Sequence, residues 1–558
     1  MTTLLKRRLL RLCLPGLLVL SAGSLPAWAQ VDPGAEALRA RLELIQQRPD
    51  IPVASETLHA AEALRLVYDQ RGYRPVWIAN QQATAALRAL PEWIAEAEAH
   101  GFQPQHYHLE ALTKRLSALP AARAAPDRLA GLVDLELLAT DATLTLARHF
   151  QDGIVDPTTI DPQWHLPRRM VSSAADLLQQ LESQPVGVAR ETLFGLLPNQ
   201  PEYRALVQRL ALQTSLRDQP WAALSPGRTL RPGDSAPIIP EIAARLAALG
   251  DGAATTGSVF DSTLESAVQR FQTRHGLTAD GVIGPETLRA LNTTPAERIA
   301  QLRANLARWR WLPADLGEEH ILVNIAGFRM EVRAGGDMVM EQRVIVGKPA
   351  RQSPVFTGNM TYIVLNPSWE VPPSIAGKDL LPQFQRDPGT VDRMGMQVLS
   401  GWGADERAID AATLDWSRYS ATSLPFRLRQ RPGPQNALGV AKFMFPNKHN
   451  VYLHDTPARG LFAKDERAFS SGCIRIADPV GLAEWVLGPR NGTPVAAPER
   501  IQSILGSGQE TTVRLKRPLA VHLLYWTAWI APDGQVHYRK DIYDRDAKLL
   551  RALDAPPR

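Results

Sequence analysis

The hydrophobic pattern of the chain changes its period near residue 319. Between about residues 50 and 220, apolar residues recur at helical spacing, as in Leu64, Val67 and Tyr68. From Glu319 onward, the segments HILVNIAGFRMEV, MEQRVIVG and MTYIVLNPSW alternate apolar and polar residues between Gly, Asn and Pro turns, which is typical of strands. A helical part followed by a β-rich part predicts a multidomain α+β protein.

The length of 558 residues is enough for about three or four domains of roughly 150 residues each. We place a helical scaffold domain at 30–223, a small helical module at 224–295 after a Pro/Gly-rich break, a β-rich domain at 318–548 and a tail at 549–558. Strand patterns lapse between about 374 and 431, which is long for a plain loop and indicates an inserted subdomain. They return at 441–455 and in VRLKRPLAVHLLYWTAWI and QVHYRKDIY, and we expect this C-terminal part to complete the same sheet.

Residues 1–29 have the pattern of an export signal peptide. Basic residues come first, then an apolar run, then a small-residue cleavage site: Lys6, Arg7, Arg8 and Arg11, the run from Leu12 to Leu20, and Ala27-Trp28-Ala29. We expect the mature chain to begin near Gln30. The apolar run is shorter than the roughly 20 residues of a spanning helix, but an uncleaved anchor that keeps the protein close to the membrane stays open as an alternative.

Loss of the signal would change the charge and the cysteine content. The chain has 62 Lys and Arg against 57 Asp and Glu; the signal holds four of the basic residues, which leaves 58 against 57. That balance, without a basic stripe interleaved with aromatics, argues against a nucleic-acid partner. Cys13 lies within the signal, so Cys473 would be the single thiol of an exported chain, where it is buried, forms an intermolecular link or reacts.

The segment NVYLHDTPARGLFAKDERAFSSGCIRIADP carries the residues suited to chemistry. If NVYLH is extended, Tyr452 and His454 share one face, and Cys473 and Arg475 can do the same. A thiol gains nucleophilicity from an imidazole that takes its proton, so His454 is the candidate base. Gly472 lets backbone N–H groups turn toward a developing oxyanion, and Arg475 can hold a negative charge. Taken singly, each has a plain structural alternative as a core or surface residue.

His454 and Cys473, the latter within Ser471-Gly472-Cys473-Ile474-Arg475, together resemble the catalytic signature of the L,D-transpeptidases with a YkuD-type domain. The resemblance extends to PVFTGNM, LNPSWEVPPS, RQRPGPQNALGVAKFMFPN and VYLHDTP. The stretch FQTRHGLTADGVIGPETLRALN resembles a peptidoglycan-binding module. The order of domains resembles that of the large periplasmic members of the family, with a weaker likeness in the helical domain.

The resemblance implies a periplasmic enzyme of peptidoglycan biosynthesis, a carbapenem target, that needs no cofactor. Its partners would be stem peptides: a tetrapeptide donor acylates Cys473 as a thioester, and the diaminopimelate amine of an acceptor resolves it into a 3-3 cross-link. His454 would be the base, and Ser471, Gly472 and Arg475 would serve the oxyanion and substrate. Tyr452 and Trp369 would line the donor pocket under a cap formed by the insert.

Several alternatives remain open from the sequence. Water could resolve the thioester, which would make the protein a thiol hydrolase or carboxypeptidase; the acceptor could be a protein; or the chain could be a non-catalytic wall-binding scaffold. Trp369 could be a core residue beside Pro372 and Pro373. Family members orient the histidine through a backbone carbonyl, which disfavours a triad with Asp455. No HExxH motif, cysteine pair or acidic cluster of metal-site spacing is present, so we expect no metal.

Overall fold

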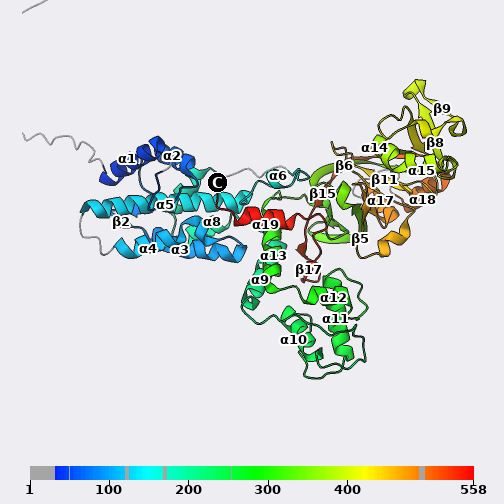
Figure 1. Cartoon of the computed structure of the whole chain (residues 1–558). Helices are drawn as coiled ribbons and strands as arrows, with labels where there is room; N and C mark the ends of the chain where they lie inside the picture. Colours follow the sequence, from blue (N-terminus) through cyan, green and yellow to red (C-terminus); the bar gives the residue numbers. More distant parts are fainter. Residues whose placement is uncertain are drawn as a thin grey trace, which may run out of the picture.

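The structure is a computed structural model that describes residues 32–48, 51–119, 125–166, 173–252, 254–313, 315–488 and 497–557. The expected signal peptide at 1–29, with Cys13, lies outside the described residues. Figure 1 shows the scaffold helices at one end, the β-rich domain at the other and the small helical module below them, with α13 and α19 at the centre. Among the described helices, none combines the length and apolar character of a membrane span.

The scaffold is helical, as its periodicity predicts. The long α5 is its central element, and α1, α2, α3 and α4 pack against it. Bounds are α1 Pro33–Gln47, α2 Ala61–Gln70, β1 Ile78–Ala79, β2 Gln82–Ala83, α3 Ala85–Glu96, α4 Leu109–Ala118, α5 Ala125–Asp152, α6 Pro157–Ile160, α7 Ala174–Ser183, α8 Val186–Phe194 and α9 Pro201–Leu216. Its core leucines, such as Leu138 and Leu146, belong to the same continuous apolar cluster as Val346 and Leu453 of the β-rich domain. Scaffold and β-rich domain therefore share one core.

The module is a compact unit of α10 (Ile239–Leu249), α11 (Ser262–Arg274) and α12 (Pro285–Leu291). Its apolar cluster, which includes Leu246, Val268 and Phe271, is separate from the main core. Helix α11 begins where the side chain of Asp261 accepts a hydrogen bond from the Leu264 N–H, which satisfies one of the unpaired donors of the first turn. Helix α13 (Pro295–Arg310) then leads the chain back to the main core.

The β-rich domain closes into a barrel. The ring runs β5-β14-β12-β11-β6-β15-β3-β4 and returns to β5 through the β4–β5 pairing, with β13 paired beside β5. The strands are β3 Glu319–Asn324, β4 Arg329–Ala334, β5 Asp337–Gly347, β6 Phe356–Leu365, β11 Ala441–Met444, β12 Leu453–His454, β13 Ala468–Ser470, β14 Ile474–Ile476 and β15 Thr511–Leu524. Helices α17 (Pro479–Leu487) and α18 (Pro498–Ser507) lie between β14 and β15 in the chain.

The C-terminal segment departs from expectation in two places. Strand β15 enters the barrel between β6 and β3, as expected, but β16 (Ala528–Ile530) and β17 (Val536–Tyr538) form a separate hairpin. The tail expected at 549–558 is largely the end of helix α19 (Asp546–Asp554), which packs against α13. Leu549 and Leu553 are four apart on one helical face and are buried in the main core, and this burial orders the segment.

The insert is a subdomain with its own sheet and core. Its strands β7 (Trp369–Glu370), β8 (Met396–Ser400), β9 (Arg407–Ile409) and β10 (Arg427–Gln430) are ordered β7-β10-β8-β9. Helices α14 (Pro373–Ile375), α15 (Leu381–Arg386) and α16 (Thr390–Arg393) complete it, around a cluster that includes Leu380, Phe384 and Trp416. Because β7 belongs to this sheet, the insert begins near residue 369, a few residues before the expected 374. We call this subdomain, residues 369–430, the cap.

Candidate active site

The barrel places His454 between two cationic side chains. Strand β12 pairs with β11 on one side and with β14 on the other, and in this register His454 lies opposite both Lys442 and Arg475. Residues opposite one another on neighbouring strands present their side chains on the same face. The ring of Tyr452 lies 5.5 Å from the His454 ring, centroid to centroid. The expected shared face of Tyr452 and His454 is therefore present, and Lys442 is added to it.

Cys473 lies in the tight turn between β13 and β14, and Ser470 closes this turn. The buried Ser470 hydroxyl donates to the Cys473 carbonyl at 2.6 Å and accepts from the Gly472 N–H at 3.1 Å. Gly472 has φ +120°, a conformation that side chains other than glycine rarely adopt. Because the Gly472 N–H is engaged within the turn, the N–H of Cys473 is the better candidate for an oxyanion donor.

Ser471, which the resemblance assigns to the oxyanion and substrate, faces away from this turn. Its side chain is exposed and accepts a hydrogen bond from Arg351 at 3.0 Å. The same guanidinium forms an ion pair with Asp379 of the cap. The structure thus gives the turn-forming role to Ser470, while Ser471 takes part in a link between the nucleophile turn and the cap.

A buried support that the sequence did not reveal holds the turn from behind. Ser353 is fully buried; its hydroxyl donates to the Gly472 carbonyl at 2.7 Å and accepts from the Gly347 N–H at 3.0 Å. The Tyr543 hydroxyl donates to the Gly347 carbonyl at 2.6 Å and accepts from the Ser353 N–H at 3.2 Å. Neither residue belongs to a recognisable motif, and both lie far from Cys473 in the chain.

A backbone carbonyl orients His454. The imidazole Nδ1 lies 2.6 Å from the carbonyl oxygen of Asp455, and because a carbonyl only accepts, Nδ1 carries the proton and Nε2 has the free lone pair. The carboxylate of Asp455 instead accepts from the Val440 N–H and from Arg459. This arrangement excludes a Cys-His-Asp triad in this structure and leaves Nε2 available as a base.

The resting pair is electrically neutral. Burial, with a smaller effect of Arg475, lowers the pKa of His454 to about 3. Burial also raises the pKa of the Cys473 thiol, against the lowering effects of hydrogen bonds with Tyr452 and of the nearby charges of Lys442 and Arg475. The thiol donates to the Asn450 carbonyl, with S···O 3.7 Å, and no hydrogen bond joins it to His454 in the described structure. Catalytic contacts of this kind often tighten only when substrate is bound.

Lys442 and Arg475 are cations without a carboxylate partner among the described residues. Both are half-buried, and burial lowers the pKa of each. The Lys442 ammonium lies 4.1 Å from the centroid of the Tyr452 ring, and the buried Nε of Arg475 has no hydrogen-bond partner. Lys442 was missed by sequence reasoning; the signal available was a lysine within the otherwise apolar segment AKFMF.

Tyr452 and Trp369 lie where the cap meets the barrel. Burial raises the pKa of the Tyr452 hydroxyl, the Cys473 charge raises it further, and a hydrogen bond with Trp369 opposes the rise. Trp369 is half-buried and packs against the apolar cluster of the cap. It therefore serves the packing of the cap and also reaches the tyrosine beside the thiol. The described residues contain no cluster of His, Cys, Asp or Glu that could hold a metal ion.

Comparison with known proteins agrees with the resemblance. Residues 318–496 match the family model of the L,D-transpeptidase catalytic domain. Residues 235–291 match the "Putative peptidoglycan binding domain" model, and residues 62–210 match the model of a scaffold domain. The family expected from the sequence is thereby confirmed for these parts of the chain.

One curated relative, a "Putative L,D-transpeptidase" of Haemophilus influenzae, is 34% identical over 258 residues, which cover 46% of this chain and 50% of the relative. The match thus spans about half the length of that relative. Among solved structures, the L,D-transpeptidase from Xylanimonas cellulosilytica shows 13% identity and a TM-score of 0.17, over 54% of this chain and 100% of that chain. A fused Zn-dependent amidase/peptidase/peptidoglycan-binding domain-containing protein from Clostridium acetobutylicum shows 13% identity and a TM-score of 0.14, over 53% and 99%. At these TM-scores neither likeness bears on the fold.

Proposed function

We propose that this chain, whose residues 318–496 match the L,D-transpeptidase catalytic domain, is an exported enzyme that forms 3-3 cross-links between diaminopimelate residues of peptidoglycan. The observation that carries the proposal is the placement of His454 and Cys473 beside Lys442 and Arg475, two cations without a carboxylate partner in the described structure, where the barrel meets the cap. The signal pattern at 1–29 and the peptidoglycan-binding match at 235–291 support a place in the periplasm, on the cell wall.

In the first step Cys473 attacks the carbonyl at the L-centre of diaminopimelate in a donor tetrapeptide. The thiol proton passes to Nε2 of His454 as the C–S bond forms; the C–N bond to the terminal D-alanine then breaks, and His454 returns the proton to the leaving amine. Because His454, with a pKa of about 3, is a weak base toward the resting thiol, the proton transfer has to accompany C–S bond formation. A carbonyl-oriented Nδ1–H keeps Nε2 free for it.

In the second step the side-chain amine of a second stem peptide attacks the thioester. A C–N bond forms as His454 takes a proton from the amine; the C–S bond then breaks, and His454 passes that proton to the sulfur, which restores the thiol of Cys473. The N–H of Cys473 would stabilise the oxyanion in both steps. Arg475 and Lys442 would bind carboxylates of the substrates, because each is a half-buried cation without a carboxylate partner in the described structure.

Mass spectrometry of reaction products tests the proposal. Purified mature protein incubated with soluble tetrapeptide muropeptides is expected to yield cross-linked dimers with loss of D-alanine, and Cys473→Ala is expected to yield none. Trimmed monomers alone would support the thiol hydrolase instead. A carbapenem is expected to acylate Cys473 and raise the intact mass; an unchanged mass after incubation would count against an accessible nucleophile.

A further inference from the structure

A cavity of about 590 Å³ lies between the module and the barrel. Its walls come from residues 273–279 at the end of α11, from the barrel at 327–329 and 341–343, from the loop at 463–467, and from the end of β17. None of the candidate active-site residues lines it. We call this cavity the seam. Its volume falls within the usual range of small-molecule sites, roughly 300–1,000 Å³.

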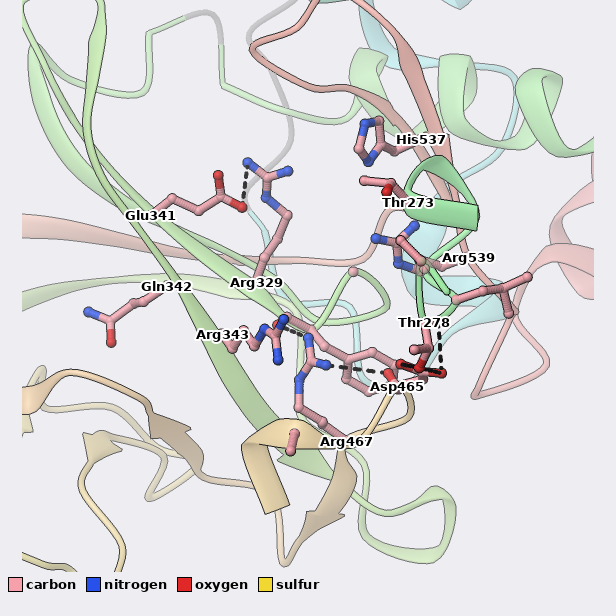
Figure 2. A pocket seen from close by; sticks show the side chains of 16 residues that line it. Thr273, Thr278, Arg329, Glu341, Gln342, Arg343, Asp465, Arg467, His537 and Arg539 are labelled. Carbon is pink, nitrogen blue, oxygen red and sulfur yellow. Dashed lines mark hydrogen bonds and ion pairs between the residues drawn. The ribbon is translucent and has the colours of Figure 1, made fainter. Parts of the chain in front are cut away.

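Positive charge exceeds negative charge in the seam. Arg329, Arg343, Arg467 and Arg539 line it against Glu341 and Asp465. Figure 2 shows Arg343 and Arg467 close together, Arg329 turned toward Glu341, and Arg539 on the opposite wall beside Thr273. Both acidic side chains are already engaged: Glu341 lies 3.4 Å from Arg329, and Asp465 accepts hydrogen bonds from Thr278 of the module.

Three of the arginines have no carboxylate partner among the described residues. Arg343 donates to the Phe462 carbonyl, Arg467 donates to carbonyls such as that of Phe328, and Arg539 donates to the Arg274 and Tyr538 carbonyls. Burial and the neighbouring guanidinium groups lower the pKa of Arg467 to about 10 and that of Arg539 to about 9. Partly buried cations that repel one another are costly unless an anion joins them.

A buried donor in the wall of the seam also lacks a partner. Arg329 is 7% exposed, and its Nε has no hydrogen-bond partner among the described residues. Gly276, at φ +67°, makes room for Arg539, because a Cβ at this position would collide with the guanidinium. Buried donors without acceptors are uncommon in proteins. The walls of the seam therefore hold cationic side chains that the acidic side chains of the described residues do not fully pair.

We propose that the seam binds a peptide bearing two or more carboxylates, of the kind that the stem peptides of peptidoglycan present. Guanidinium groups bind carboxylates through paired hydrogen bonds, and a ligand here would touch the module and the catalytic domain together. Three contacts already hold the two parts together. Thr278 donates a hydrogen bond to Asp465, Arg539 packs closely against Gly276, and Arg274 donates to the Val536 carbonyl. The peptidoglycan source of the ligand rests on the proposed function, whereas the excess charge of the seam does not.

Calorimetry on the full chain tests this site. The background variant is Cys473→Ala, which blocks turnover, and the probe is a soluble tetrapeptide muropeptide. Arg343→Gln is the informative change, because Arg343 is exposed and makes one backbone hydrogen bond, so folding is not at risk. Arg514→Gln is the matched control: it also removes an exposed strand arginine, but Arg514 does not line the seam.

We expect the Kd of the muropeptide for the seam to rise by about tenfold or more in Arg343→Gln, since a hydrogen bond to a charged group contributes on that order. Arg514→Gln should leave binding unchanged. The same muropeptide with its carboxylates amidated should lose that binding. Equal isotherms for Arg343→Gln and its parent would overturn the site. Tight binding of inorganic phosphate or citrate without binding of the muropeptide would overturn the peptide ligand.

The site and the proposed function can fail separately. In an otherwise wild-type chain, Arg343→Gln should leave acylation of Cys473 by a carbapenem unchanged, because the Arg343 side chain lines the seam and donates to the Phe462 carbonyl. Loss of acylation in that variant would show that Arg343 acts on the catalytic turn and would overturn the assignment of a separate site. Absence of acylation in the wild type would count against the proposed function, while the calorimetry would still decide the seam.

Discussion

Replacing Ser353 by alanine tests the buried support of the nucleophile turn. The Ser353 hydroxyl is fully buried and satisfies two buried backbone groups, the Gly472 carbonyl at 2.7 Å and the Gly347 N–H at 3.0 Å. Alanine leaves both groups without a partner. At roughly 1–3 kcal/mol for each unsatisfied buried group, and with partial relaxation, we expect a loss of about 3 kcal/mol in the free energy of unfolding.

The matched control is Ser471→Ala in the same turn. The Ser471 hydroxyl is exposed, and its partner Arg351 keeps its ion pair with Asp379, so the expected change is within about 0.5 kcal/mol. Urea unfolding of the full-length chain measures both values, and the rate of Cys473 acylation by a carbapenem reports the position of the turn. Ser353→Ala should also slow acylation, because the Gly472 carbonyl is no longer held.

The comparison of the two serines decides the outcome. If Ser353→Ala unfolds at the same urea concentration as Ser471→Ala and acylates at the wild-type rate, the buried hydroxyl does not hold the turn, and the positioning role assigned to it is wrong. A loss of stability without any change in the acylation rate would show that Ser353 stabilises the fold but does not position the turn.

Three further predictions follow from the titrating and charged groups. Because the pKa of Cys473 is raised, the rate of its alkylation by iodoacetamide should keep increasing as pH rises through 9. A plateau of this rate below pH 7 would contradict the neutral resting pair. His454, with a pKa of about 3, should remain an available base down to about pH 4. Burial raises the pKa of Glu136 from 4.5 to about 7. The protonated carboxyl therefore stabilises the fold fully below pH 4.5, and this contribution, about 3 kcal/mol at most, is lost as pH rises through 7. Glu136→Gln should flatten the dependence of the unfolding temperature on pH between pH 5 and 8. Asp379→Asn removes the ion pair with Arg351 and should lower the free energy of unfolding by under about 1 kcal/mol. It should nevertheless speed amide hydrogen exchange at residues 376–380. Unchanged exchange there would argue against a link between the cap and the turn.

Much of the architecture follows from local patterns in the sequence. The change from helical to strand periodicity predicts the scaffold helices and the strands from β3 to β6, and the long gap in strand pattern predicts the cap. The spacing of His454 and Cys473 predicts the pair that the barrel places on neighbouring parts of the sheet. These features are readable because each depends on residues close together in the chain.

Other features depend on contacts between distant parts of the chain. Lys442 joins the site because strand register places it opposite His454, and register is set only when strands pair. Ser353 bonds the Gly472 carbonyl of the turn, and Tyr543 bonds Ser353 from behind, through hydrogen bonds that span more than a hundred residues of sequence. The hydroxyl of Ser470 faces into the turn while that of Ser471 faces out, because the backbone conformation of the turn decides which hydroxyl faces inward.

The sequence by itself determined the α+β class and the family of the catalytic domain, and it nominated Cys473 and His454 as candidate nucleophile and base, because these features depend on residue type and short-range spacing. Tertiary structure decided the closure of the barrel, the helical C-terminal end, the backbone carbonyl behind His454 and the arginine-lined seam between module and barrel. Each of these requires side chains or backbone groups from separate segments to meet, and burial and hydrogen bonding between those segments select the arrangement.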